Sequence, residues 1–246
     1  LVSHELRRPM TIIAGNTRLL TQRRHVLDTA AIDSALADVD DASSRLARII
    51  DDLLILARPE SGAALETEPL PVQRLIEQAV QEHRRVFAGR EVSIDAAAAA
   101  PYVMADRGCV QQVLQNLLSN AEKYSPGETP IDVYAWNEGD EIVISVADRG
   151  IGVTEAEAGR LFEPFYRTPD AAETARGIGV GLAVCKRLTE AMGGRIWARP
   201  RDGGGTALFV ALPAAAVDDA DDDAAAWPPD DASEPEATVA APPATA

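Results

Sequence analysis

The chain has 246 residues, of which 46% are hydrophobic and 25% charged, so it can form one or two domains that each bury a core. No stretch approaches the roughly 18 consecutive apolar residues that a membrane-spanning helix needs. The formal net charge of -16 opposes binding to nucleic acid or to an anionic membrane surface through general electrostatics. The two cysteines, Cys109 and Cys185, form no Cys-x-x-Cys pair and the histidines do not cluster, so neither a disulfide framework nor a zinc site is predicted, and a reducing cytoplasm fits best.

The two ends differ in character from the rest of the chain. The chain begins at Leu1 without Met, and helix-like apolar spacing runs from its first residues, which indicates a fragment of a longer protein with no visible signal peptide. From Asp218 onward there are seven Asp and two Glu but no Lys or Arg. We therefore predict that residues 214–246 form a disordered acidic tail, which carries more than half of the net negative charge.

Residues 1–58 predict a helical hairpin. Apolar residues recur at intervals of three, four or seven along two segments, namely Leu6, Met10, Ile13 and Leu20, and then Leu36, Val39, Leu46, Ile50 and Leu53. Such stripes pack two helices together, and the polar residues 23–29 predict the turn between them. Further apolar side chains widen the stripes beyond a single seam, at Ile12, Leu19, Ile49, Leu54 and Leu56. A second copy is therefore the predicted partner, in a four-helix bundle formed by dimerisation, although packing of the hairpin only on the rest of its own chain stays open.

A second domain is predicted after a linker. The linker covers residues 59–71 and contains Pro59 and Gly62. The domain covers residues 72–213, with predicted helices at 72–87, 106–124 and 181–192 and predicted strands at 91–95, 131–136, 141–148, 195–199 and 206–212. Helices and strands in this mixed order predict an α+β sandwich, with helices on one face of a mixed sheet.

A histidine and a glutamate stand together near the start of the first helix. His4 lies about 200° around the helix from Leu6, nearly opposite the apolar stripe, and should face solvent. A neutral imidazole can act as a nucleophile when a neighbouring carboxylate, here that of Glu5, orients its N–H group. The pair by itself also fits an ordinary solvated helix face.

The helix predicted at residues 106–124 carries polar side chains on one face. Asn116, Asn120 and Lys123 are four and three residues apart and share that face, and Tyr124 follows them. Amide oxygens and an ammonium group suit Mg²⁺ and the phosphates that it carries. Two helix asparagines alone also fit a capping or solvated role.

Two glycine-containing segments predict places where the backbone can approach a ligand closely. Asp148 follows a strand and is itself followed by Gly150 and Gly152, and its carboxylate can accept a hydrogen bond from an amine such as the exocyclic group of adenine. The segment 177–181, Gly-Ile-Gly-Val-Gly, leads into a helix, and a glycine-rich loop at a helix N-terminus can bind an anion. Its spacing is neither the Rossmann fingerprint nor a Walker loop, and each segment alone also fits a plain turn.

The order of these motifs is more specific than any one of them. The His-Glu helix, the Asn helix, the Asp148 segment, the aromatic segment 161–167 (Leu-Phe-Glu-Pro-Phe-Tyr-Arg) and the glycine loop follow one another as the H, N, G1, F and G2 boxes of sensor histidine kinases do. Over residues 1–213 the chain resembles the catalytic region of a two-component histidine kinase. The resemblance implies a dimerising phosphoacceptor hairpin followed by an ATP-binding domain of the GHKL, or Bergerat, type.

The resemblance implies an enzyme activity and partners. His4 would be the phosphoacceptor, phosphorylated from ATP, with Glu5 as its acid–base partner. The phosphoryl group would then pass to an Asp in the receiver domain of a response regulator. The segment would lie in the cytoplasm as part of a membrane-anchored sensor, with membrane contact only through a missing N-terminal region. Transfer within one protomer and transfer across the dimer are both compatible with the predicted turn.

The resemblance also implies a nucleotide site. Mg²⁺ and phosphates would be held by Asn116 and Asn120, with Lys123 and Tyr124 in support, and adenine would be read by Asp148. The glycines that would surround the nucleotide are Gly150, Gly152, Gly177, Gly179 and Gly181. Two aromatic residues would dock within a flexible lid over 153–176, namely Phe162 and Phe165.

One position departs from the family pattern, and two other functions stay open. The chain reads His-Glu-Leu-Arg-Arg-Pro where the family usually has Thr or Asn at the place of Arg8, a residue that helps to position water. Because Arg has donors but no acceptor, we predict weak or absent regulator-phosphatase activity. The alternatives are a catalytically silent ATP-binding regulator and a GHKL-type ATPase without phosphohistidine. Intact His4, Glu5 and Asp148 argue against the first, and the His-bearing hairpin argues against the second.

Overall fold

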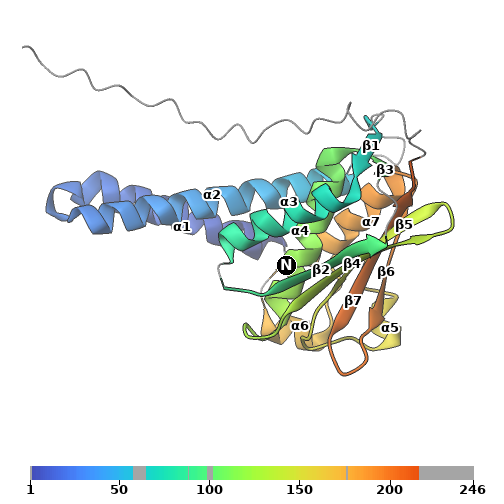
Figure 1. The fold of residues 1–246 in the computed structure, drawn as a ribbon. Helices are drawn as coiled ribbons and strands as arrows, with labels where there is room; N and C mark the ends of the chain where they lie inside the picture. Colours follow the sequence, from blue (N-terminus) through green and yellow to red (C-terminus); the bar gives the residue numbers. More distant parts are fainter. Residues whose placement is uncertain (1, 58–64, 88, 99–101, 176, 216–246) are drawn as a thin grey trace, which may run out of the picture. The chain divides into compact units, whose positions relative to one another are not determined.

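The fold is described from a computed structural model (Figure 1). The structure describes residues 2–57, 65–87, 89–98, 102–175 and 177–215. Most of the predicted acidic tail and the first part of the predicted linker lie outside these residues.

The N-terminal segment is a hairpin of two helices, as predicted. Helix α1 spans Val2–Arg23 and helix α2 spans Thr29–Ala57, with a short 3-10 turn at Arg24–Val26 between them. The Asp28 side chain accepts a hydrogen bond from the Ala31 amide (2.7 Å), which caps the start of α2 because the first amides of a helix have no partner within the helix.

The two helices bury only part of their apolar surface against each other. Small residues of α2, Ala35 and Ala42, are buried, whereas Met10, Leu36 and Leu54 keep more than half of their surface exposed (57%, 53% and 54%). Exposed leucine and methionine side chains in a stripe favour association with a further helix pair.

The C-terminal segment is built on a five-stranded sheet in the order β2-β4-β5-β7-β6. The sheet strands are β2 (Val92–Ala98), β4 (Ile131–Glu138), β5 (Glu141–Ala147), β6 (Arg195–Pro200) and β7 (Thr206–Pro213). The β2-β4 pair is parallel and the other pairs are antiparallel, so the sheet is mixed, as predicted.

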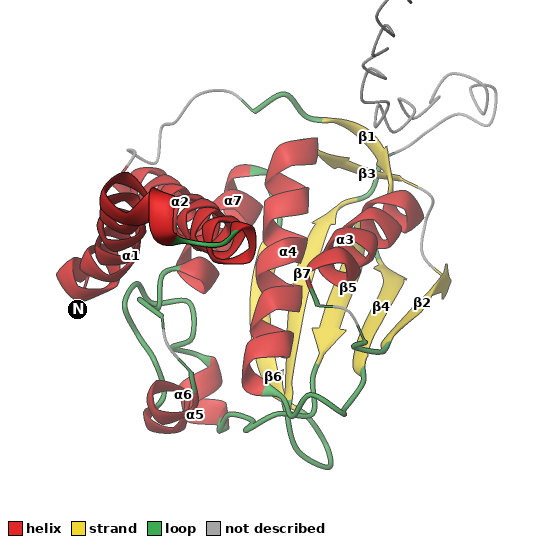
Figure 2. Ribbon diagram, turned by 90° about the vertical axis from the view of Figure 1, so that its left-hand side faces the viewer, coloured by secondary structure: helices red, strands yellow, loops and turns green. Residues whose placement is uncertain are grey.

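Three helices cover one face of this sheet (Figures 1 and 2). They are α3 (Val72–Val86), α4 (Arg107–Tyr124) and α7 (Gly181–Ala191). The core lies between the two layers, where Leu117 and Leu118 of α4 and Ile142 and Ile144 of β5 are at most 1% exposed. Burial of such side chains is the main stabilising contribution to the fold, and it holds α4 rigidly against the strands.

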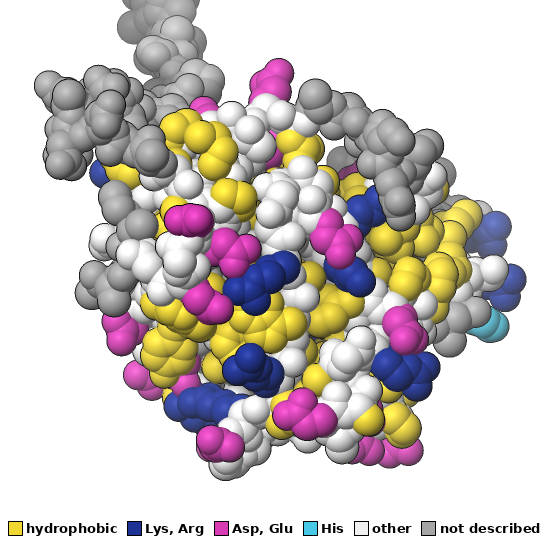
Figure 3. Space-filling view, turned by 90° about the vertical axis from the view of Figure 1, so that its right-hand side faces the viewer, with side chains coloured by type: hydrophobic (Ala, Val, Ile, Leu, Met, Phe, Trp, Pro, Cys, Tyr) yellow, Lys and Arg dark blue, Asp and Glu magenta, His cyan; other side chains and the backbone are white. Residues whose placement is uncertain are grey.

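The opposite face of the sheet is covered by its own large side chains. Trp197 stacks on Phe209 with ring centroids 5.2 Å apart, Trp136 meets Phe209 edge to face, and the Arg195 guanidinium lies over Trp197. Figure 3 looks at the molecule from the side opposite to Figure 2 and shows hydrophobic side chains interleaved there with basic and acidic ones. These aromatic and arginine side chains shield the inner residues of β5, including Val143, from water.

The structure also contains elements that the sequence did not predict. Strand β1 (Glu68–Pro71) lies within the segment predicted as linker and pairs with β3 (Tyr102–Ala105) as a separate two-stranded sheet. Two short helices, α5 (Glu155–Ala158) and α6 (Pro169–Thr174), lie within the predicted lid. Each is preceded by a threonine whose side chain caps the helix by accepting a backbone hydrogen bond.

Candidate functional site

The polar face of α4 supplies the first side of the site. Asp106 caps the start of the helix, because its side chain accepts a hydrogen bond from the Cys109 amide (2.9 Å). The apolar face of the helix is buried against the sheet, which leaves the side chains of Asn116, Asn120 and Lys123 half-buried on the other face. The amide nitrogen of Asn116 is buried and has no hydrogen-bond partner within the described part of the chain.

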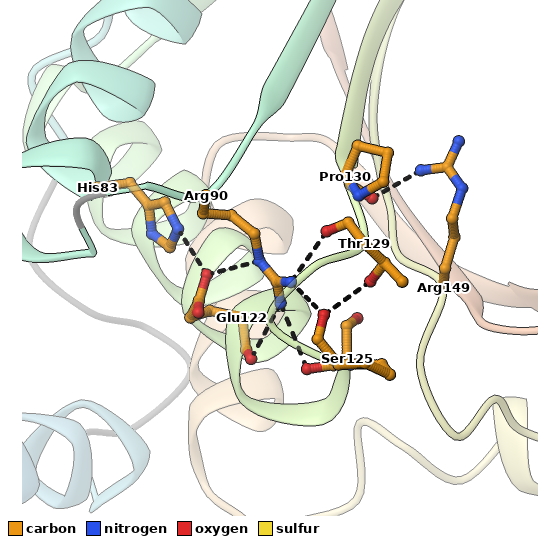
Figure 4. Close-up of polar contacts among 8 residues, drawn as sticks. His83, Arg90, Glu122, Ser125, Thr129, Pro130 and Arg149 are labelled. Carbon is orange, nitrogen blue, oxygen red and sulfur yellow. Dashed lines mark hydrogen bonds and ion pairs between the residues drawn. The ribbon is translucent and has the colours of Figure 1, made fainter.

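The C-terminal end of α4 is held by one buried arginine (Figure 4). The Arg90 guanidinium donates to the Glu122 carboxylate (2.9 Å) and to four backbone carbonyls, those of Glu122, Ser125, Pro126 and Thr129. The last carbonyls of a helix have no partner within the helix, so Arg90 satisfies the carbonyl of Glu122 and complements the negative end of the helix dipole, while its other carbonyl contacts hold the residues that follow α4. Arg90 thereby sets where α4 ends and where the following loop runs.

A buried histidine lies against the same glutamate. The His83 side chain is 1% exposed, and its Nε2 atom lies 3.4 Å from Oε2 of Glu122. Burial lowers the pKa of His83, and the neighbouring Glu122 only partly opposes this. His83 is therefore neutral at neutral pH and packs as part of the α3–α4 core, with its ring tilted against Phe87.

The Asp148 loop packs on that end of α4. Gly150 approaches so closely that a Cβ atom there would lie 2.3 Å from the Tyr124 carbonyl oxygen, and the Ile151 amide donates to the same oxygen (3.3 Å). The Asp148 carboxylate is buried and accepts hydrogen bonds from the amides of Gly150 (2.7 Å) and Thr206 (3.2 Å). Burial raises the pKa of Asp148, while these two amides act in the opposite direction. These two backbone amides hold the Asp148 carboxylate directly.

The glycine loop lies next to the polar face of α4. A Cβ atom on Gly177 would lie 2.8 Å from Nζ of Lys123, and one on Gly181 would lie 3.7 Å from Oδ1 of Asn116. Gly179 has a φ of +77°, which favours glycine. The loop leads directly into α7, so backbone amides at a helix N-terminus and the Lys123 ammonium converge on one place, which suits an anion.

The aromatic segment is tied to the glycine loop through its backbone. The Phe165 amide donates to the Gly179 carbonyl (2.8 Å), while the Phe165 side chain is 50% exposed. Neither predicted aromatic residue of this segment, Phe162 or Phe165, lines the cavity of the site; their neighbours Leu161 and Tyr166 do.

Arg167 links this segment to the loop that precedes α7. Its guanidinium donates to the carbonyls of Ala171, Ala175 and Gly177. The sequence analysis assigned no role to Arg167, although Arg167 directly follows Phe165 and Tyr166. Arg90 and Thr206 were likewise missed, because their contacts reach residues far away in the sequence.

These parts surround one cavity of about 450 Å³. The predicted residues that line it are Asn116, Asn120, Lys123, Tyr124, Asp148, Gly152, Gly177, Gly179 and Gly181. Gly150 lies beneath, where it permits the close packing on Tyr124. A cavity of this size with few convergent polar groups is typical of a small-molecule site.

The residues of the cavity fit a nucleoside triphosphate with its metal. A carboxylate acceptor at Asp148 suits an exocyclic amine, and the Lys123 ammonium beside the glycine loop suits phosphate oxygens. The Asn116 amide, whose nitrogen lacks a partner in the described residues, can turn its oxygen to Mg²⁺. No cluster of three or more His, Cys, Asp or Glu side chains that could hold a metal by itself occurs among the described residues.

The predicted histidine and its glutamate lie on α1. His4 is exposed, as predicted. The Glu5 carboxylate forms an ion pair with Arg45 of α2 (3.2 Å), and both residues also line the cavity, together with Arg48 and Asp52. The cavity therefore contains the carboxylate next to the predicted phosphoacceptor.

Comparisons with known proteins agree with this arrangement. Residues 1–62 match the family described as His Kinase A (phospho-acceptor) domain, and residues 105–216 match the family described as histidine kinase-, DNA gyrase B- and HSP90-like ATPase. The chain is 33% identical over 214 residues to the alginate biosynthesis sensor protein KinB of Pseudomonas aeruginosa, which covers 86% of this chain and 36% of KinB.

Solved structures show the same fold. Full-length ShkA in complex with AMPPNP has a TM-score of 0.65 and 29% identity, covering 87% of this chain and 45% of that one. The histidine kinase ThkA, solved in complex with the response regulator protein TrrA, has a TM-score of 0.64 and 24% identity, covering 87% of this chain and 60% of that one. At that identity the ThkA likeness shows the fold alone.

The fold and both matches define a phosphoacceptor-type hairpin joined to a GHKL-type ATPase domain. The chain belongs to the sensor histidine kinases of two-component systems. It spans only 24% to 36% of the length of the first curated relatives that it matches. Within the described residues, no helix is both long enough and apolar enough to span a membrane.

Proposed function

We propose that this segment phosphorylates its own His4 from ATP and passes the phosphoryl group to an Asp of a response regulator. One observation carries the proposal: Asp148, the polar face of α4 and the glycine loop converge on a single cavity, which Glu5, the neighbour of His4, also lines. Phosphoryl transfer requires little more of a protein than positioning and charge stabilisation, and these residues can supply both.

The nucleotide would be held at its two ends by different groups. Asp148 would accept a hydrogen bond from the exocyclic amine of adenine. Lys123 and the amides at the start of α7 would bind phosphate oxygens, and Asn116 and Asn120 would hold Mg²⁺, which neutralises phosphate charge when bound.

The location of the segment in the cytoplasm stays a prediction.

The chemical step would take place at His4. A neutral ring nitrogen attacks the γ-phosphorus, the bond from that phosphorus to the β–γ bridging oxygen breaks, and ADP leaves. The Glu5 carboxylate would accept a hydrogen bond from the other ring N–H and stabilise the positive charge that develops on the imidazole. The ion pair of Glu5 with Arg45 orients this carboxylate before the reaction.

The proposed partners are a second copy of the chain and a response regulator. The exposed apolar side chains of the hairpin, Met10, Leu36 and Leu54 among them, support a dimer. The response regulator is supported by the family and by ThkA, whose fold is shared and whose structure contains the regulator TrrA. Arg8 is exposed, and we still predict weak or absent phosphatase activity toward the regulator. Rapid release of phosphate from a purified phospho-regulator would contradict this prediction.

The proposal is tested by incubation with γ-labelled ATP and Mg²⁺. We expect label on the protein that is lost in acid and survives alkali, as for a phosphoramidate. The label should disappear in His4→Gln and persist in His25→Gln, a matched control in which an exposed histidine of the hairpin turn is changed. ATP hydrolysis without any label would favour the GHKL ATPase, and ATP binding with neither label nor hydrolysis would favour the silent regulator.

A further inference from the structure

A buried carboxylate outside the cavity lies between two arginines. Asp132 of β4 is 5% exposed, and its Oδ2 atom accepts from Nη2 of Arg201 (2.7 Å) and from Nη2 of Arg149 (2.9 Å). Its other oxygen accepts from the Ser93 hydroxyl (2.8 Å). Burial alone would raise the pKa of Asp132, but the hydrogen bonds from Ser93, Arg201 and Arg149 outweigh it and hold the pKa below its usual range.

Each of the two arginines also donates a hydrogen bond to a backbone carbonyl. Arg201 donates through Nη1 to the carbonyl of Asp148 (3.2 Å), and Arg149 donates through Nη1 to the carbonyl of Pro130 (2.6 Å). A guanidinium can serve a carboxylate and a carbonyl at once because its donors point in fixed, diverging directions. Arg201 thus connects Asp132 of β4 to the backbone of Asp148. Arg149, the residue that follows Asp148, is itself bound to Asp132.

The sheet brings these groups to one end. Asp132 stands opposite Ala147 in the β4–β5 register, and Ala147 is the residue before Asp148. Arg201 belongs to the turn between β6 and β7, where a Cβ atom on Gly205 would lie 2.1 Å from the Asp148 carbonyl oxygen. Two other parts of the chain, strand β4 and the turn between β6 and β7, therefore lie against the segment that carries Asp148.

We propose that Asp132, Arg149 and Arg201 form an ionic clamp that fixes the Asp148 carboxylate and thereby determines the preference for adenine. The inference rests on the proposed role of Asp148 in the nucleotide site. The three residues do not line the cavity, so they are positioning residues that act through Asp148. A fixed acceptor pairs with an exocyclic amine but stays unpaired against the carbonyl of hypoxanthine, whereas an acceptor that can move away discriminates less.

The test compares two arginines of the same β6–β7 hairpin. Arg201→Gln breaks the clamp, and Arg195→Gln is the matched control, since Arg195 is also paired with carboxylates, those of Glu138 and Glu141, but at the far end of the hairpin. The measurement is the dissociation constant of ATP and of inosine triphosphate for the whole chain. We expect Arg201→Gln to weaken ATP about tenfold and inosine triphosphate much less. Arg195→Gln should change neither value.

Two further variants make the outcome decisive. Asp132→Asn keeps the shape of the side chain but removes its charge, and it should lower the ATP to inosine triphosphate preference as Arg201→Gln does. If both variants weaken the binding of ATP and of inosine triphosphate by the same factor, or change neither dissociation constant, the preference for ATP is unchanged and the clamp is refuted. Asp148→Asn separates this failure from that of the proposed function: if it leaves the preference unchanged, Asp148 does not read adenine at all.

Discussion

Replacing Arg90 by Met should destabilise the nucleotide-binding half of the chain by about 3–5 kcal/mol, the range found when one partner of a buried ion pair is removed. Met keeps much of the side-chain volume, so the loss comes from the guanidinium. Without it, the Glu122 carboxylate loses its 2.9 Å partner and the carbonyls of Glu122, Ser125 and Thr129 lose the guanidinium donor, whereas the Pro126 carbonyl keeps hydrogen bonds from the amide and hydroxyl of Thr129. Since Glu122 is 19% exposed and can regain some water, we expect a value near the middle of that range.

The assay is urea unfolding followed by circular dichroism and by tryptophan fluorescence, because Trp136 and Trp197 both lie in the sheet. With a dependence of about 2 kcal/mol per molar urea, the midpoint should fall by about 2 M. The urea midpoint of Arg90→Lys should lie between those of the parent and Arg90→Met, since an ammonium keeps the charge but cannot reach all the carbonyls. Arg85→Met, a change at an exposed arginine of α3, should stay within about 0.5 kcal/mol of the parent.

A loss below about 1 kcal/mol in Arg90→Met would refute this reasoning, because the carbonyls at the end of α4 would then be satisfied equally well by water. A double-mutant cycle with Glu122→Gln separates the ion pair from the carbonyl contacts. If the coupling between the two changes is near zero, the carbonyls account for the effect.

Three further predictions follow from single contacts of the structure. The pKa of His83 is lowered in the folded state, so unfolding takes up a proton once the pH falls below about 6.5. The free energy of unfolding should therefore drop by up to about 1.4 kcal/mol per pH unit in this range. If the curves of stability against pH run parallel for the parent and His83→Gln, this prediction is wrong. Gly150→Ala should weaken ATP binding at least about tenfold with an unchanged circular dichroism spectrum, because the new Cβ would lie 2.3 Å from the Tyr124 carbonyl oxygen, whereas Gly127→Ala, with open space around it, should bind normally. Burial raises the pKa of Cys185 to about 12, so iodoacetamide at pH 8 should leave it unlabelled in the folded protein and label it after unfolding; mass spectrometry that finds it labelled before unfolding would disprove this.

Much of the fold could be predicted because its long helices and core strands carry a local signal. The stripes of α1 and α2 and the apolar runs of β5 and β7 mark their own elements through their spacing. Strand β1 escaped prediction because it has only four residues, two of them prolines. It exists through its pairing with β3, where Leu70 stands opposite Val103, and no local pattern reports such a pairing.

The sequence by itself determined the residue types of the candidate site, since glycines beside Asp148 and asparagines four apart on a helix carry their chemistry locally. Only the tertiary structure decided which neighbours position them. Arg90 reaches residues 32 to 39 positions away, and Arg201 reaches Asp132 across 69 positions. Leu161 and Tyr166 line the cavity in place of the predicted phenylalanines, because the backbone bond of Phe165 to Gly179 and its φ of +66° direct the segment. Such contacts depend on how helices and strands pack, and packing joins residues that the sequence keeps far apart.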